Sequence, residues 1–162
     1  MGTTLYAQEA RNGMRGGVQM AALASEDRAW NWGAGYYMHL LLRRPVAREW
    51  ALQPELGVSL GGSRRLALTK LQLGAMLQWY PQPEWYFQAG HTGSYLLPRE
   101  EDEAEEFALV SFQGEMAVGV GYQWNNFLGV EVRYGMGLHD LRKEDGPPVS
   151  ERWLQIGLNL SL

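Results

Sequence analysis

The last ten residues of the chain, residues 153–162, alternate strictly between apolar side chains and side chains that are mostly small or polar. Because successive side chains of a β-strand point to opposite faces, this stretch predicts a strand with one fully apolar face and one polar face. The polar face carries no Lys or Glu, which a water-exposed face usually would. A transmembrane barrel explains this pattern, because its outer face contacts lipid and its inner face lines a narrow polar lumen.

The composition leaves few ways for such a chain to cross a membrane. Its mean hydropathy is −0.31, and no stretch approaches the ~18–20 unbroken apolar residues of a spanning helix. A closed barrel is the other structure that satisfies every backbone polar group in lipid. The 20 glycines, 7 tryptophans and 8 tyrosines fit a small barrel. In such a barrel, glycines relieve crowding inside and aromatic side chains form girdles at the two rims.

Turn signals divide the rest of the chain into seven further alternating segments. Arg43, Arg44 and Pro45 are predicted to end the second segment, because proline removes a backbone donor from the ladder. Pro54 lies inside the third segment and predicts a bulge or a locally missing hydrogen bond there. With the last ten residues, the predicted strands cover residues 14–23, 30–41, 50–60, 66–80, 85–97, 107–123, 127–138 and 153–162.

The sequence therefore predicts an all-β fold, an eight-stranded antiparallel up-and-down transmembrane β-barrel formed by residues 13–162. Residues 1–12 are expected to precede this domain as an N-terminal segment. Within that segment, Thr3 to Gln8 is interpreted either as the remnant of a cleaved signal peptide or as an ordinary disordered terminus. Both interpretations stay open, because the basic start and apolar core of a signal peptide are missing.

The connections between the strands indicate an orientation. The second, fourth and sixth connections, residues 43–49, 81–84 and 124–126, are short, whereas the fifth and seventh are longer and more charged. Outer-membrane barrels have short periplasmic turns and longer outer loops, so both termini are expected in the periplasm. Aromatic residues at the strand ends predict a girdle at each rim, comprising Trp30, Trp50, Trp79, Trp85, Tyr95, Trp124 and Trp153.

A soluble ligand-binding barrel of the lipocalin type is the main alternative fold. Its strands would also alternate, but with apolar residues inside and positions rich in Lys and Glu outside. In this chain the polar positions are mostly Gly, Gln, Asn, Ser and Thr. That choice of residues favours the membrane barrel, in which the apolar face contacts lipid.

Five stretches carry a resemblance to a known family. They are LQPELGVSLGG (residues 52–62), LTKLQLGAMLQWY (68–80), WYFQAGHTGSYLL (85–97), VGVGYQW (118–124) and GVEVRYGMGL (129–138). In order and spacing they resemble the PorT-like outer-membrane β-barrel domain, common in Bacteroidetes and related to OmpA/OmpX-type eight-stranded barrels. The resemblance implies localisation in the bacterial outer membrane. It also implies a role beside a larger complex, since some members are associated with secretion or gliding apparatus.

The tail QIGLNLSL, residues 155–162, resembles the signal that the outer-membrane barrel assembly machinery reads. The matching positions are Gln155, Gly157, Leu160 and Leu162. Such signals usually end in an aromatic residue, whereas this one ends in Leu162. The resemblance implies the assembly machinery as a partner of the chain.

Six charged residues are predicted to point into the lumen: Arg15, Glu55, Lys70, Glu115, Glu131 and Arg133. Side chains fill an eight-stranded interior, and buried charges must pair, so we interpret the six as a structural ion-pair network. Glu131 and Arg133 lie two positions apart on one face, close enough to share that network. Two alternatives are a gated proton or ion path, and a carboxylate active site with Glu115 and Glu131 on adjacent strands.

Other residues give little support for an enzyme or a metal centre. Ser94 follows His91 by three positions, so the two side chains face opposite sides of a strand. His39, His91 and His139 fall in different segments, and the chain has no cysteine. The acidic run of residues 100–106 is interpreted as a solvated loop, with cation bridging to lipopolysaccharide or a partner as the alternative. We expect no catalytic residue, no metal and no cofactor.

The expected role is structural or binding. The net charge of −4 argues against nucleic acid as a partner. We expect an outer-membrane anchor that presents its outer loops, or an accessory subunit of a larger outer-membrane complex. The expected partners are outer-membrane lipid, lipopolysaccharide, the barrel assembly machinery and such a complex. The alternatives are a narrow ion or small-solute pore, a barrel enzyme acting on lipids, and a soluble lipocalin-like barrel that binds a hydrophobic ligand.

Overall fold

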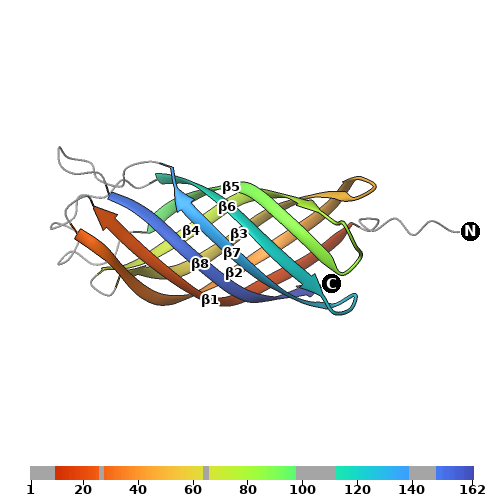
Figure 1. Cartoon of the computed structure of the whole chain (residues 1–162), viewed down its shortest axis with the longest axis horizontal. Helices are drawn as coiled ribbons and strands as arrows, with labels where there is room; N and C mark the ends of the chain where they lie inside the picture. The colour runs from red at the N-terminus through yellow and green to blue at the C-terminus, as the bar shows by residue number, and fades with distance from the viewer. Residues whose placement is uncertain (1–9, 26–27, 64–65, 98–111, 139–148) are drawn as a thin grey trace, which may run out of the picture.

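The computed structural model describes residues 10–25, 28–63, 66–97, 112–138 and 149–162. None of the described residues forms a helix of the length and apolarity that a membrane crossing requires. They form eight strands (Figure 1): β1 (Arg11–Ser25), β2 (Arg28–Ala47), β3 (Trp50–Ser63), β4 (Leu66–Trp79), β5 (Trp85–Leu97), β6 (Phe112–Gln123), β7 (Leu128–Gly137) and β8 (Val149–Ser161).

Each strand pairs antiparallel with its neighbour in sequence, and β1 pairs with β8 to close the barrel. The closing ladder runs from Gly13 opposite Ser161 to Ser25 opposite Val149 without a shift of register. The predicted eight-stranded antiparallel barrel is therefore confirmed. Closure removes the free sheet edge that an open sheet would present.

Two strands, β2 and β8, extend furthest beyond their predicted ends. β2 continues to Ala47, well past the predicted end at Leu41. The β2–β3 ladder shifts register between Pro45 and Ala47, so a bulge accommodates the proline near the end of the strand. β8 begins at Val149 rather than at residue 153, and this extension brings Glu151 into the barrel wall.

Pro54 interrupts strand pairing without changing the register. The pairs on either side of it, Leu41 with Glu55 and Arg44 with Leu52, belong to one continuous register of the β2–β3 ladder. The ladder skips the two positions between them, because proline has no N–H to donate. Of the two outcomes predicted for Pro54, the bulge is therefore wrong and the local loss of pairing is the one that occurs.

The described chain enters the barrel slightly before the predicted boundary. β1 begins at Arg11, two residues ahead of residue 13. The segment Thr3 to Gln8 and the predicted start of the sixth strand, residues 107–111, lie outside the described residues.

Apolar side chains cover the outside of the barrel and polar side chains fill the inside. Leu73 in β4 is 66% exposed and Tyr36 in β2 is 68% exposed, whereas Arg15 and Glu131 are fully buried. A soluble ligand-binding barrel has the reverse arrangement, so the structure excludes the lipocalin-like alternative. An apolar surface of this extent is suited to lipid rather than to water.

Both ends of the barrel domain lie at one rim, together with the three short turns (Figure 1). We call this rim the terminal end and the opposite rim the loop end. In the β6–β7 turn, Asn125 Oδ1 accepts hydrogen bonds from the backbone N–H of Phe127 over 2.8 Å and of Leu128 over 2.9 Å. Asparagine is common in turns for this reason, and here it fixes a tight connection.

Replacing Leu73 with Arg tests which side of the wall contacts lipid. Leu73 lies midway along β4 on the outer face, so Leu73→Arg is expected to destabilise the barrel in a bilayer by about 2–4 kcal/mol. The matched control is Leu60→Arg, close to the loop end of β3, where the cost falls to about 0–1 kcal/mol. Urea unfolding in phospholipid vesicles, followed by tryptophan fluorescence, measures both costs. Equal costs at the two positions would contradict the lipid-facing assignment.

Candidate functional site: ion-pair clusters inside the barrel

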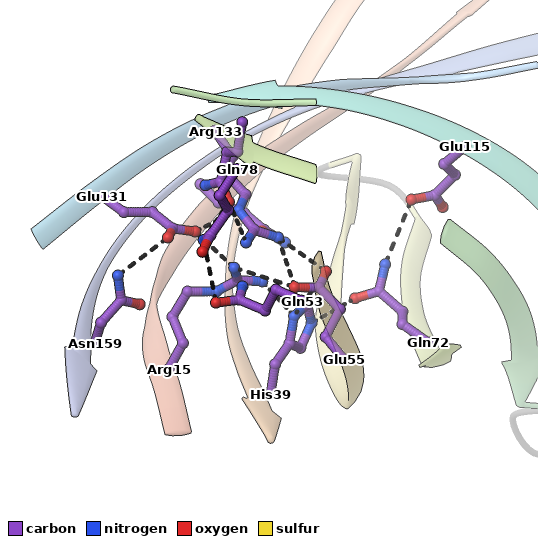
Figure 2. Close-up of polar contacts among 12 residues, drawn as sticks. Arg15, His39, Gln53, Glu55, Gln72, Gln78, Glu115, Glu131, Arg133 and Asn159 are labelled. Carbon is purple, nitrogen blue, oxygen red and sulfur yellow. Dashed lines mark hydrogen bonds and ion pairs between the residues drawn. The ribbon is translucent and has the colours of Figure 1, made fainter. Parts of the chain in front are cut away.

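Four charged side chains meet in the lumen (Figure 2), and their positions along β1, β3 and β7 place them nearer the terminal end. We call Arg15 of β1, Glu55 of β3, and Glu131 and Arg133 of β7 the four-charge cluster. Arg15 Nη1 lies 2.6 Å from Glu131 Oε1 and 3.4 Å from Glu55 Oε2. Arg133 Nη1 lies 2.8 Å from Glu55 Oε1, and Arg133 Nε pairs with Glu131. Each guanidinium therefore contacts both carboxylates, and the formal charges of the cluster cancel.

Neutral polar groups add hydrogen bonds to this cluster. Tyr86 Oη donates to Glu131 Oε2 over 2.7 Å, and Asn159 Nδ2 donates to the same oxygen over 3.0 Å. Arg133 Nη2 donates to Gln88 Oε1 over 2.9 Å. Buried ion pairs are tolerated when such additional hydrogen bonds compensate for the loss of water.

His39 joins the four-charge cluster to the rest of the lumen. Its Nδ1 accepts a hydrogen bond from Arg15 Nη2, because a guanidinium has only donors. The ring is therefore neutral with its proton on Nε2, which donates to Gln72 Oε1 over 3.0 Å. His39 therefore links Arg15 of β1 to Gln72 of β4 through one hydrogen bond to each.

A second group, which we call the Lys70 cluster, lies nearer the loop end and consists of Lys70, Glu115 and Glu151. Lys70 Nζ lies 2.9 Å from Glu115 Oε1 and also pairs with Glu151. Trp153 Nε1 donates to Glu115 Oε2 over 2.9 Å, and Ser94 Oγ donates to Glu115 Oε1 over 2.9 Å. All three charged side chains are buried, and two carboxylates share one ammonium.

Gln72 connects the two clusters (Figure 2). Its Oε1 accepts from His39, while its Nε2 donates to Ser94 Oγ over 3.2 Å and to Glu115 Oε2 over 3.4 Å. A continuous chain of hydrogen bonds and ion pairs therefore runs along the lumen. Two of its ion pairs, Arg133 of β7 with Glu55 of β3 and Lys70 of β4 with Glu151 of β8, join strands that are not neighbours in the wall, so the chain cross-links opposite sides of the barrel.

The structure thus brings the six predicted lumen charges into two clusters rather than one. Four of them form the four-charge cluster, and the other two, Lys70 and Glu115, pair with each other. Glu115 and Glu131 lie on the adjacent strands β6 and β7, but different basic residues engage them. The carboxylate-pair active site considered from the sequence is therefore not formed.

Several members of these clusters were not singled out from the sequence. His39 and Tyr86 lie on the inward phase of their strands, and extending the alternation by one position in β5 would have identified Tyr86. Glu151 was missed because the last strand was predicted to start only at Trp153. A search for polar residues on every inward phase, carried through to the strand ends, would have found all three.

The predicted aromatic girdle is distributed over both rims. Trp50, Trp79, Trp85 and Trp124 are exposed on the outer side at the terminal end, and Trp50 stacks on Trp79 with ring centroids 6.3 Å apart. Tyr95 is exposed near the loop end of β5. The side chain of Trp30 lies outside the described residues.

The assignment of Trp153 to the girdle is wrong. Its side chain is only 5% exposed and points into the lumen, in phase with the other inward residues of β8. Gly135 lies opposite it on β7, and a Cβ at that position would overlap the indole ring. The missing side chain of Gly135 therefore provides the space that Trp153 fills.

The remaining candidates do not form a further site. Ser94 points into the lumen, whereas His91 lies on the outer face, so the two are separated as predicted. Within the described part of the chain, no group of three or more His, Cys, Asp or Glu residues is placed to hold a metal ion. The acidic run of residues 100–106 and His139 lie outside the described residues.

The four positions of the tail that resemble an assembly signal are divided between the two faces of β8. Gln155 and Gly157 point inward, whereas Leu160 and Leu162 are exposed outside. Gln155 Nε2 donates to Gln19 Oε1 over 3.0 Å across the closing ladder. The outward leucines form an apolar row, in keeping with a strand that contacts lipid.

A closed eight-stranded barrel with an apolar outer wall and an ion-paired interior defines a class, the transmembrane β-barrels of the bacterial outer membrane. A family model described as "Outer membrane protein beta-barrel domain" matches residues 6–143, and the chain belongs to this family. The comparison with curated proteins gives no match.

Solved structures of outer-membrane proteins share the fold. The Neisserial surface protein A gives a TM-score of 0.68 at 13% identity, over 93% of this chain and 97% of that one. Ail, the attachment invasion locus protein of Yersinia pestis, gives 0.61 at 9% identity, over 96% and 100%. OprG from Pseudomonas aeruginosa gives 0.51 at 12% identity, over 94% and 96%. At these identities the likeness shows the fold alone.

Proposed function

We propose that this small outer-membrane barrel is a closed, non-enzymatic protein with a structural or binding role. It anchors and presents the outer loops, or it serves as an accessory subunit of a larger outer-membrane complex. The observation that carries this proposal is the lumen, in which every charged side chain of the two clusters is buried and paired.

The width of the lumen supports a closed barrel over a pore. An eight-stranded barrel is only just wide enough for its own side chains. Arg15, Arg133 and Tyr86 are among the largest fully buried side chains, and all three contact Glu131 inside the barrel. A passing ion would have to separate several ion pairs at once, and each separation leaves an unpaired buried charge.

Single-channel recording tests this proposal. Protein refolded into planar lipid bilayers is expected to show no steady conductance, because the two clusters block the lumen. The matched control is the variant Arg15→Ser, Glu131→Ser, Lys70→Ser and Glu115→Ser, which leaves the net charge of each cluster unchanged and removes two long side chains from each. This variant is expected to conduct measurably and shows that the assay can detect an open lumen. A steady conductance of the unmodified protein would contradict the proposal and favour the narrow pore.

The orientation and the partners are part of the same proposal. The terminal end lies in the periplasm and the loop end faces outward, which the short turns at the terminal end support (Figure 1). The partners are outer-membrane lipid, lipopolysaccharide and the barrel assembly machinery, which reads Gln155, Gly157, Leu160 and Leu162. The resemblance to the PorT-like domain supports the accessory role in a larger membrane complex.

A further inference from the structure

A polar side chain lies in the middle of the lipid-facing wall. The outward row of β5 is Trp85, Phe87, Ala89, His91, Gly93, Tyr95 and Leu97. With a rise of about 3.4 Å per residue and a strand tilt of about 40°, His91 lies about 15 Å in depth from Trp85 and about 10 Å from Tyr95. The imidazole of His91 is therefore distant from the lipid headgroups at both rims.

His91 has no hydrogen-bonding partner among the described residues. It differs in this from His39, which is held by Arg15 and Gln72 inside the barrel. A polar group left unbonded in hydrocarbon is unfavourable, and an ionisable side chain at membrane depth is a candidate for function. The outward orientation of His91 therefore calls for a partner from outside the barrel.

The residues around His91 have mostly small side chains. Ala75 of β4 and Met116 of β6 lie directly opposite it on the neighbouring strands, and Ala89 and Gly93 flank it along β5. We call these four residues, together with His91 itself, the His91 surface. Small side chains at a membrane surface let another protein approach closely enough to share hydrogen bonds.

We infer that the His91 surface is the contact through which two copies of this chain associate in the membrane, around a twofold axis beside His91. A neutral imidazole carries one donor and one acceptor, so two such rings can bond to each other. A second copy inserted in the same orientation presents its His91 at the same depth, and a twofold axis makes the surface self-complementary. This inference goes beyond the proposed function and does not depend on it.

The tilt of the strands accounts for the small extent of this surface. Each β5 strand is inclined by about 35–45° to the membrane normal, so two β5 strands related by the twofold axis cross each other. Contact between crossing strands is concentrated around one position. One polar residue flanked by Ala75, Ala89 and Gly93 fits this geometry better than a long apolar stripe would.

Cysteine cross-linking tests the inference, because the chain has no cysteine of its own. The variant Ala89→Cys places a thiol in the His91 surface, and Ala34→Cys places one on the outer face of β2, a strand separated from β5 by β3 and β4. Both full-length variants are refolded into phospholipid vesicles at low protein density and treated with a mild oxidant. Disulfide-linked dimers are expected to form about ten-fold faster for Ala89→Cys than for Ala34→Cys.

Replacing His91 itself tests whether its hydrogen bond drives the association or whether the two β5 strands are merely close. Adding His91→Leu to Ala89→Cys is expected to slow cross-linking about ten-fold, whereas His91→Gln, which keeps a donor and an acceptor, is expected to retain most of it. Leu suits the lipid face, so His91→Leu should still fold, and the shift of the folded band on boiling checks this. Equal cross-linking at both cysteines, unchanged cross-linking in His91→Leu, or a monomer throughout would overturn the inference.

Discussion

The variant Glu131→Gln is expected to lower the free energy of unfolding by about 3–5 kcal/mol, because it breaks a buried ion pair from one side only. In the four-charge cluster, Arg15 and Arg133 would then share Glu55 as their one carboxylate. Gln keeps the shape of the side chain and an oxygen that accepts hydrogen bonds. The loss of stability therefore measures the effect of removing the charge rather than a change in packing.

A double variant is the matched control for Glu131→Gln. Combining it with Arg15→Met removes one charge of each sign and leaves the pair of Arg133 with Glu55 intact. The double variant is expected to be more stable than Glu131→Gln alone, because no uncompensated charge remains buried. Urea unfolding in lipid vesicles and the folded band on unboiled gels measure both. If the changes in unfolding free energy caused by the two substitutions simply add, the interpretation of the four charges as paired is wrong.

The second large effect is expected from Gly121→Ala, which should cost about 1–3 kcal/mol by overpacking the lumen. A Cβ on Gly121 would overlap the Tyr86 ring. That ring has little freedom to move, since its hydroxyl donates to Glu131 over 2.7 Å and its centroid lies 5.3 Å from the ring centroid of Tyr80. Position 121 therefore requires a glycine, because a residue with a Cβ would overlap the Tyr86 ring.

Gly16→Ala is the control for this overpacking. Gly16 lies on the outer phase of β1, where an added Cβ would meet only the carbonyl oxygen of Tyr37 at 3.5 Å. Its substitution is expected to change stability by no more than about 0.5 kcal/mol. In the background of Tyr86→Ala, which removes the facing ring, the further change Gly121→Ala should cost much less stability than it does in the unmodified protein if the clash is the cause. Similar losses of stability for Gly121→Ala and Gly16→Ala would instead indicate that the strands need the backbone flexibility of glycine at both positions.

The wall of the barrel was predictable from the sequence, because one period of two residues decides which side chains face lipid and which face the lumen. The contacts across the lumen were not predictable. They depend on the tilt and stagger of all eight strands, which place Arg15 beside Glu131 but separate Glu131 from Glu115. Only the closed structure fixes those distances.

Trp153 shows where two signals from the sequence conflicted. Its place in the alternation pointed inward, whereas its residue type and its position near a strand end suggested the girdle. The alternation was the correct guide, because Gly135 on the next strand leaves room for the indole. Pro45 gives a similar lesson, since a bulge lets β2 continue past a residue that was expected to end it.

The pairing of β1 with β8 also restricts the order of events during assembly. These two strands are separated by almost the whole described chain, so the ladder between them waits until β8 has been synthesised. Until then, each carries a row of backbone groups without partners, which hydrocarbon does not satisfy. In lipid without the assembly machinery, the wall therefore does not enter the bilayer one strand after another. Insertion and closure then occur together as one late step, in which β8, the last strand of the barrel, pairs with β1, the first.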